Sequence, residues 1–325
     1  MIQVGIIGGA GYTAGELIRL LLQHPNAAIN FVYSTSNAGN KLSHVHQDLE
    51  GNTALKFTQE INYSIDVLFL CLGHGNSKKF LEKYTFAKYT KIIDLGNDFR
   101  LSKDAIFNEK DFVYGLPEFQ KEAIQNAKYI ANPGCFATAI QLALLPLANS
   151  KQLVNDVHIN AVTGATGAGT SLSATTHFTW RDNNFSYYKP FTHQHLGEIQ
   201  QTVTSLQSSF ESELFFLPNR GNFSRGIFAT LYTEFEGSIE EAKELYVAYY
   251  KEHPFTHISE NSIHLKQVVN TNKCLIHLHK HHHQLLITSS IDNLLKGASG
   301  QAVQNMNLLF DLPEATGLHL KATYF

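Results

Sequence analysis

A glycine loop between an apolar run and a helix-like segment constrains the fold of this chain more than any other feature. The run Ile2 to Ile7 is typical of a short buried strand, and Gly8-Gly9-Ala10-Gly11 follows it directly. The next segment, 13–23, carries its leucines and isoleucine at helical spacing. Because Thr13 and Glu16 fit a capping box, we expect the helix to begin where the glycines end. An anion is stabilised at such a helix end by the free N–H groups.

Strand-like and helix-like segments alternate in the first part of the chain. We expect strands at 28–33, 65–72 and 92–95, and a helix at 76–84. This alternation predicts an α/β fold with a Rossmann domain, in which the parallel sheet is doubly wound.

After about residue 157 the strand-like runs come with fewer helices between them. We expect strands at 157–162, 227–235, 263–269 and 275–279, and helices at 196–206, 239–250 and 299–309. This change predicts a second, α+β domain with a mixed, largely antiparallel sheet. A chain of 325 residues is long enough for two domains.

Charge, apolar runs and cysteines narrow the class of protein. The formal net charge is −3 and no basic block is present, so a nucleic-acid partner is not expected. The richest apolar run, 136–148, is too short to cross a bilayer, so no membrane partner is expected either. Because the first strand begins at residue 2, we expect no secretion signal. The three cysteines form no Cys-x-x-Cys pair, and free thiols favour a cytoplasmic location.

The glycine loop suits a dinucleotide cofactor, although a tight strand-to-helix turn with no ligand has the same pattern. Gly8 and Gly11 let the backbone approach a pyrophosphate. An NAD-preferring domain carries an acidic residue after its second strand, about 20 residues on. This chain has Ser34-Thr35-Ser36-Asn37 there, with Lys41 nearby. Hydroxyls, an amide and a cation can bind a 2′-phosphate, and no carboxylate repels it. The sequence therefore predicts NADP(H) rather than NAD(H).

Cys135 stands out among the cysteines because Asn132-Pro133-Gly134 precedes it and an apolar helix-like segment follows. A thiol at a helix N-terminus has its thiolate stabilised by unpaired N–H groups and the helix dipole. We therefore interpret Cys135 as a nucleophile. Cys71 and Cys274 lie in or beside strand-like runs, which is typical of small buried apolar residues.

The tract 279–283, His-Lys-His-His-His, lies between two strand-like runs. We interpret it as the polar tip of a hairpin, because no spaced third ligand or carboxylate accompanies it. No metal site is expected.

Several motifs together resemble the N-acetyl-γ-glutamyl-phosphate reductase family (type 1), a group of semialdehyde dehydrogenase-like enzymes of arginine biosynthesis. The similarity spans nearly the whole chain, and its motifs occur in the expected order: Gly8-Gly9-Ala10-Gly11-Tyr12-Thr13, Asp98-Phe99-Arg100-Leu101, Tyr114-Gly115-Leu116-Pro117-Glu118, the Cys135 segment, and Asn293-Leu294 with Lys296-Gly297-Ala298 and Gly300-Gln301-Ala302. The chain departs from the family at Gly197, where a proline is usual, and at Thr170, where an arginine is usual.

The resemblance implies reduction of N-acetyl-γ-glutamyl phosphate by NADPH to N-acetylglutamate 5-semialdehyde and phosphate. Thiolate attack by Cys135 would expel phosphate and leave a thioester that accepts hydride. A thiohemiacetal then needs an acid and base, for which His193 is the candidate. His195 would face the other way on an extended segment and orient the substrate.

The same resemblance implies further site residues. Those expected at the acyl-phosphate substrate are Arg100, Tyr187, His195, Glu198 and Arg225. Those expected at the cofactor are Gly8, Gly11, Tyr12, Thr13, Ser34, Ser36, Gly167, Asn293 and Gln301. Arg100 suits a phosphate dianion, although a surface ion pair with Asp98 or Asp104 is an alternative.

The resemblance also implies domain limits and an oligomer. Residues 1–134 plus 299–325 would form the NADP-binding domain, and 135–298 the catalytic and dimerisation domain of a homodimer or homotetramer.

Three rival functions remain open. An aspartyl- or aminoadipyl-phosphate semialdehyde dehydrogenase would share the glycine loop, the cysteine and the histidine with this chain. A non-catalytic nucleotide sensor would keep the fold, and a cysteine-dependent acyl hydrolase would need no nucleotide loop. The acyl group on the substrate nitrogen, whether acetyl, succinyl or carrier-linked, is also left open.

Overall fold

The structure, a computed structural model, describes all 325 residues and divides them into two units. Unit 1 comprises Met1–Pro133 and Ala298–His319, and unit 2 comprises Gly134–Gly297 and Leu320–Phe325. The last six residues therefore group with unit 2, whereas the sequence placed them with the first domain. Two hydrogen bonds hold them there, from the Thr323 N–H to the Val269 carbonyl (3.1 Å) and from Asn270 Nδ2 to the Lys321 carbonyl (3.4 Å).

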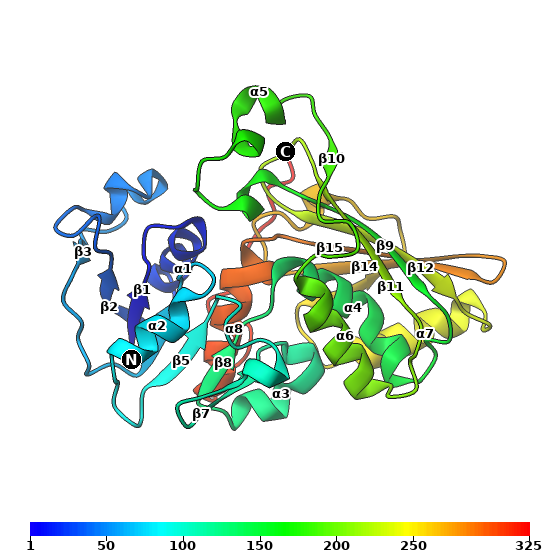
Figure 1. Ribbon diagram of the computed structural model, residues 1–325, viewed down its shortest axis with the longest axis horizontal. Helices are drawn as coiled ribbons and strands as arrows, with labels where there is room; N and C mark the ends of the chain where they lie inside the picture. Colours follow the sequence, from blue (N-terminus) through cyan, green and yellow to red (C-terminus); the bar gives the residue numbers. More distant parts are fainter. The chain divides into compact units, whose positions relative to one another are not determined.

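Unit 1 is built on an eight-stranded sheet in the order β3-β2-β1-β4-β5-β8-β7-β6 (Figure 1). Only the edge pair β6/β7 is antiparallel. The predicted doubly wound Rossmann sheet is therefore confirmed. Its strands are β1 (Ile2–Ile7), β2 (Ala27–Tyr33), β3 (Phe57–Thr58), β4 (Val67–Leu70), β5 (Lys91–Asp94), β6 (Ile106–Phe107), β7 (Lys110–Tyr114) and β8 (Tyr129–Ala131).

Four α-helices belong to unit 1: α1 (Tyr12–Leu22), α2 (Asn76–Lys83), α3 (Pro117–Gln125) and α8 (Gly300–Leu309). The C-terminal helix α8 packs against α1, α3 and β5, although these three elements lie far from α8 in the sequence (Figure 1). The expected capping box at Thr13 is wrong. Helix α1 begins one residue earlier, with Gly11 as an N-cap that offers no side chain. Glu16 instead forms an ion pair with Arg19, one turn along the helix (2.7 Å).

Unit 2 is built on a seven-stranded mixed sheet in the order β10-β11-β9-β12-β15-β14-β13. The pairs β9/β11 and β13/β14 are parallel and the others antiparallel, which confirms the predicted mixed sheet. Its strands are β9 (Val157–Thr163), β10 (Ser186–Tyr187), β11 (Leu214–Arg220), β12 (Ile227–Glu234), β13 (Thr256–Ser259), β14 (Cys274–His281) and β15 (Gln284–Ile291).

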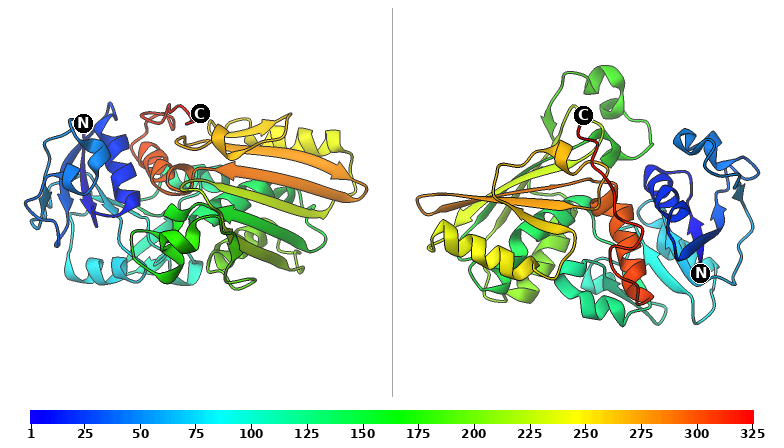
Figure 2. Two further views of the ribbon diagram at one scale, coloured as in Figure 1. Left: turned by 90° about the horizontal axis from the view of Figure 1, so that it is seen from above. Right: turned by 180° about the vertical axis from the view of Figure 1, so that it is seen from behind.

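The helices of unit 2 are α4 (Cys135–Asn149), α5 (Phe178–Arg181), α6 (His195–Leu206) and α7 (Ile239–Tyr250). Helices α4, α6 and α7 cover one face of the sheet (Figure 2). Helix α4 is buried from Phe136 to Ala148. None of the helices in the structure combines the length and apolar character needed to cross a bilayer.

One predicted strand of unit 2 is wrong. Residues 263–269 contain a 3-10 turn (Leu265–Gln267), and the strand lies earlier, at β13. The Gln267 side chain accepts the His264 N–H (2.8 Å), so the segment is closed into a turn before it can pair. The histidine tract ends the β14–β15 hairpin, as the sequence predicts, with His282 in the left-handed region (φ 51°).

Candidate active site

Cys135 is the first residue of α4, and Gly134 is its N-cap. The backbone of Gly134 is extended (φ −71°, ψ 150°), so the chain turns sharply into the helix at this point. The thiol thus lies where the helix dipole and the unpaired N–H groups of the first turn favour a thiolate. This is the local geometry that the sequence predicts around Pro133 and Gly134.

The imidazole of His195 packs directly against Gly134. A Cβ placed on Gly134 would lie 2.3 Å from His195 Nε2, so only glycine leaves room for the ring. Glu198, one turn further along α6, accepts the Gly134 N–H through Oε2 (2.9 Å). Its Oε1 lies 4.0 Å from His195 Nε2. His195 and Glu198 are therefore both fixed at the residue that precedes the candidate nucleophile.

His193, the expected acid and base, is buried in the structure. Its Nδ1 accepts the His195 backbone N–H (3.2 Å), which requires an unprotonated Nδ1. Burial and the charge of Lys189 lower the pKa of His193 to about 4. The rings of His193 and His195 lie 4.6 Å apart, so the two histidines do not face opposite ways. The reason is that the segment turns into α6 at His195 and is not extended.

The tyrosine beside this site is Tyr188. Tyr187, which the sequence singled out, lies on edge strand β10 and is 64% exposed. Burial and, to a smaller extent, the Cys135 thiol raise the pKa of Tyr188. Its ring makes an edge contact with His193, with centroids 5.6 Å apart. Neighbouring residues of an extended segment point to opposite faces. The sequence therefore could not tell which of the two tyrosines faces the site without knowing where the sheet lies.

Gly297 packs against the other side of Cys135. It lies in a π-helical turn (Leu295–Ser299), and a Cβ on it would lie 2.8 Å from the Cys135 Cβ. The Gly297 N–H donates to the Asp292 carbonyl (2.9 Å), which holds the turn in place. Sequence reasoning saw Lys296-Gly297-Ala298 as part of a motif but gave no physical role to the glycine.

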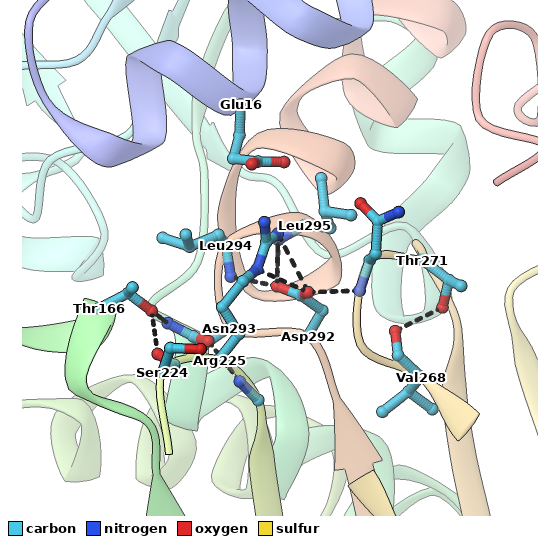
Figure 3. Close-up of polar contacts among 12 residues, drawn as sticks. Glu16, Thr166, Ser224, Arg225, Val268, Thr271, Asp292, Asn293, Leu294 and Leu295 are labelled. Atoms are coloured by element: carbon cyan, nitrogen blue, oxygen red, sulfur yellow. Dashed lines mark hydrogen bonds and ion pairs between the residues drawn. The ribbon is translucent and has the colours of Figure 1, made fainter. Parts of the chain in front are cut away.

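Arg225 is held by a buried carboxylate, that of Asp292 (Figure 3). Its Nε donates to Oδ2 (3.1 Å) and its Nη2 to Oδ1 (3.2 Å). The same carboxylate accepts backbone N–H groups from Asn270, Leu294 and Leu295. The guanidinium of Arg225 is thus oriented by a partner that balances its charge.

Asn293 and Gly167, both expected at the cofactor, lie near each other in unit 2. The Asn293 Oδ1 accepts the Gly226 N–H (2.7 Å), and its Nδ2 donates to Thr166 Oγ1 (3.0 Å) (Figure 3). Gly167 follows in a 3-10 turn (Ala165–Ala168). The Asn293 side chain therefore joins two loops.

In unit 1 the glycine loop is tight at its start and open at its end. Gly8 has φ +79°, and a Cβ there would lie 2.5 Å from the Cys71 carbonyl oxygen. A Cβ on Gly11 would meet nothing within 4 Å, which leaves the start of α1 accessible to a ligand. Tyr12 and Thr13 follow in the first turn of α1, and Tyr12 is 45% exposed. The loop therefore fits a pyrophosphate.

Beside the carboxyl end of β2, hydroxyl and amide groups form a small cluster. The Asn37 Nδ2 donates to Ser34 Oγ (3.3 Å) and to Ser36 Oγ (3.0 Å). These polar groups suit a 2′-phosphate.

Arg100 and Gln301 are both buried in unit 1. Arg100 donates to the carbonyls of Asn132 (2.8 Å) and Leu95 (3.0 Å). Asp104, one of the two carboxylates considered as an alternative partner of Arg100, pairs with Lys78 (3.3 Å). Gln301 lies in α8, which is buried throughout.

Comparisons with known proteins give matches in both units of the chain. Residues 3–127 match the family described as "Semialdehyde dehydrogenase, NAD binding domain", and residues 135–293 match "Semialdehyde dehydrogenase, dimerisation domain". The chain is 64% identical to an N-acetyl-gamma-glutamyl-phosphate reductase of Christiangramia forsetii, with all of both chains covered. It is 63% identical to the Flavobacterium johnsoniae protein of the same name, again over all of both chains.

Solved structures with the same fold are more distant in sequence. An aspartate semialdehyde dehydrogenase II of Vibrio cholerae, complexed with ASA, is 15% identical with a TM-score of 0.74, covering 96% of this chain and 98% of that one. The aspartate semialdehyde dehydrogenase of Candida albicans, solved with NADP, is 16% identical with a TM-score of 0.68, covering 95% and 98%.

Proposed function

The chain belongs to the N-acetyl-γ-glutamyl-phosphate reductases of the semialdehyde dehydrogenase family, and on that premise we propose that it reduces N-acetyl-γ-glutamyl phosphate with NADPH. The products are N-acetylglutamate 5-semialdehyde and phosphate, in arginine biosynthesis. The observation that carries the proposal is the thiol of Cys135 at the start of a buried helix, with His195 packed on the preceding glycine.

The chemistry begins with the Cys135 thiolate. The sulfur attacks the acyl carbon, and the bond from that carbon to the phosphate oxygen breaks, so phosphate leaves and a thioester remains. NADPH, when bound, supplies the hydride that reduces the thioester carbonyl. The oxyanion formed by hydride addition would take a proton from the catalytic acid to give a thiohemiacetal. When that proton returns to the catalytic group, the carbonyl reforms and the C–S bond breaks. The aldehyde is then released and the thiolate is restored.

His195 is the better candidate for the proton transfers. Its ring lies against Gly134, one residue from the thiol, and Glu198 stands 4.0 Å away to stabilise the protonated ring. The Nδ1 of His193 is already committed as an acceptor, and its low pKa keeps the ring neutral near pH 7. We assign His193 the task of holding the start of α6, and therefore of orienting His195.

Most of the proposed cofactor groups belong to unit 1. Gly8, Gly11, Tyr12 and Thr13 would hold the pyrophosphate, and Ser34 and Ser36 the 2′-phosphate. The positive φ of Gly8 and the open space at Gly11 support this fit. Arg100, buried beside the Asn132 carbonyl, remains the candidate for the leaving phosphate.

The sheet of unit 2 supports a homodimer or homotetramer. On the face opposite the helices, the His158 ring stacks between Phe215 (5.2 Å) and Tyr232 (4.8 Å), which come from the two neighbouring strands. Tyr232 is 46% exposed. These strands lie within the matched dimerisation domain, so the partner for this face is a second copy. Light scattering after size-exclusion chromatography measures the assembly, and a monomer would contradict it.

The substrate's acyl group is acetyl in this proposal, with succinyl as the alternative to be tested. The names of the relatives favour a glutamyl phosphate over the aspartyl and aminoadipyl rivals. A cytoplasmic location is supported by the three free cysteines.

One assay in the reverse direction tests reaction, cofactor and acyl group together. Phosphate-dependent reduction of NADP is followed with N-acetyl- and N-succinylglutamate semialdehyde side by side, and again with NAD. We expect turnover only when phosphate is present, and faster turnover with NADP. Turnover without phosphate, or with aspartate semialdehyde alone, would contradict the proposed function.

A further inference from the structure

Two arginines of unit 2, Arg181 and Arg220, lie close together without a carboxylate partner. Arg181 ends α5 and donates from Nη2 to the Gly221 carbonyl (3.0 Å). Arg220 ends β11, and its guanidinium carbon lies 4.0 Å from the ring centroid of Tyr188. Burial and the like charge of Arg220 lower the pKa of Arg181. Two neighbouring cations with no counterion are unfavourable unless an anion joins them.

The pair is linked to the candidate active site through Tyr188. Arg220 lies over one face of the Tyr188 ring, and that ring makes an edge contact with His193, with centroids 5.6 Å apart. Arg225, the other arginine of unit 2, differs because Asp292 neutralises it through two hydrogen bonds. Among the three arginines of unit 2, Arg181 and Arg220 are thus the two without a carboxylate partner.

We propose that Arg181 and Arg220 form a subsite that binds a carboxylate of the substrate. This assignment rests on the proposed function. A planar guanidinium presents its N–H groups in a fork that matches a carboxylate, and the Tyr188 ring beneath Arg220 orients that fork. After phosphate leaves, the acyl chain must stay in place through reduction, and its carboxylate is the anion that persists.

Two carboxylates of the substrate class have this chemistry. One is the α-carboxylate of the glutamyl group, which every N-acyl version carries. The other is the terminal carboxylate of a succinyl group, which an acetyl group lacks. The experiment therefore compares an acetylated and a succinylated ligand.

Binding without turnover gives the first test. Calorimetry measures the dissociation constants of N-acetylglutamate and N-succinylglutamate for wild type, Arg181→Gln and Arg220→Gln. We expect each substitution to raise a dissociation constant about tenfold to a hundredfold, the usual effect of losing a charge-assisted hydrogen bond. Lys189→Gln, which removes an exposed cation near His193, serves as the charge control and should change it less than about threefold.

The pattern of loss identifies the carboxylate. An equal loss for both ligands, together with a raised KM for the semialdehyde, which has no γ-carboxylate, assigns the pair to the α-carboxylate. A loss confined to N-succinylglutamate assigns it to the terminal carboxylate of the succinyl group. Equal dissociation constants in wild type and both Gln variants, or no binding by wild type, would overturn the proposal.

Kinetics in the reverse direction give the second test. The Gln variants should raise the KM for the semialdehyde with a smaller change in kcat, and Arg220→Lys should recover part of the loss. Labelling of Cys135 by iodoacetamide and the dissociation constant of NADP should not change. A rise in the KM for phosphate alone would assign the pair to phosphate and overturn the carboxylate. If wild type turns over no acyl phosphate, the proposed function fails, and calorimetry still decides on the subsite.

Discussion

The imidazole of His195 fills the space beside Gly134, where a Cβ would lie 2.3 Å from Nε2. Glu198 also contacts Gly134, because its carboxylate accepts the Gly134 N–H (2.9 Å). The start of α4, which carries Cys135, is therefore joined to the start of α6 through a glycine that admits the ring. On the strength of this contact we propose that His195, and not His193 as first expected, carries out the proton transfers.

Cys135→Ser should abolish turnover while NADP binding and folding stay intact, because an unactivated hydroxyl is a poor nucleophile near neutral pH. Steady-state rates, NADP titration and thermal melting check the three parts. In wild type, iodoacetamide should label Cys135 first. Burial and then Asp94 raise the pKa of Cys71, and Cys274 is buried. Substantial turnover by the serine variant would rule out the thioester.

His195→Ala should lower kcat by about two to four orders of magnitude, the usual contribution of a positioned acid or base. His193→Ala should lower it less, because His193 acts through the His195 backbone. Both rates are measured beside single-turnover release of phosphate, which reports thioester formation. A larger loss in the His193 variant would return the proton-transfer role to that residue.

The free energy of unfolding should decrease as the pH is lowered from about 6.5 to about 4, because of His193. The unfolded chain protonates this imidazole below its ordinary pKa of 6.5, whereas the folded protein resists protonation until about pH 4. The unfolded state therefore binds more protons between these values, and the stability present above pH 6.5 is lost as the pH falls. Urea unfolding of wild type and His193→Gln checks this. The variant should lose less free energy of unfolding over that interval, and parallel curves would contradict the assignment.

Gly297→Ala should slow the reaction through Cys135. The new Cβ would lie 2.8 Å from the Cys135 Cβ and 3.2 Å from its Cα, so the nucleophile must shift. We expect a tenfold or greater loss in kcat, on the order of that seen for small displacements of reacting groups, and slower alkylation of the thiol. Gly73→Ala is the control, since its Cβ would meet only Asn76 Nδ2 at an ordinary 3.5 Å. Unchanged alkylation in the Gly297 variant would refute this role.

Ser36→Asp should weaken NADP binding more than Ser36→Ala does. The carboxylate repels a 2′-phosphate, whereas alanine only removes the hydroxyl that accepts from Asn37 (3.0 Å). Fluorescence titration with NADPH and NADH measures both affinities. A preference of the wild-type protein for NADH would show that the interpretation of residues 34–37 is wrong.

Local patterns in the sequence determined the fold class and the nucleophile candidate. Strand and helix periods are properties of short segments, so the Rossmann sheet, helix α7 and the β14–β15 hairpin could be predicted. The turn before Cys135 is also local, because Pro133 and Gly134 set the backbone at the helix start. Where a local pattern is compatible with both a strand and a turn, as at 263–269, the predicted strand is wrong.

Tertiary structure alone decided which side chains meet at the site. The contacts of Gly134 with Glu198, and of Cys135 with Gly297, join residues that are far apart in the chain. The same holds for Arg225 with Asp292, and for the choice of Tyr188 over Tyr187. Such contacts depend on how helices and strands pack, and no periodicity within one segment encodes the position of another.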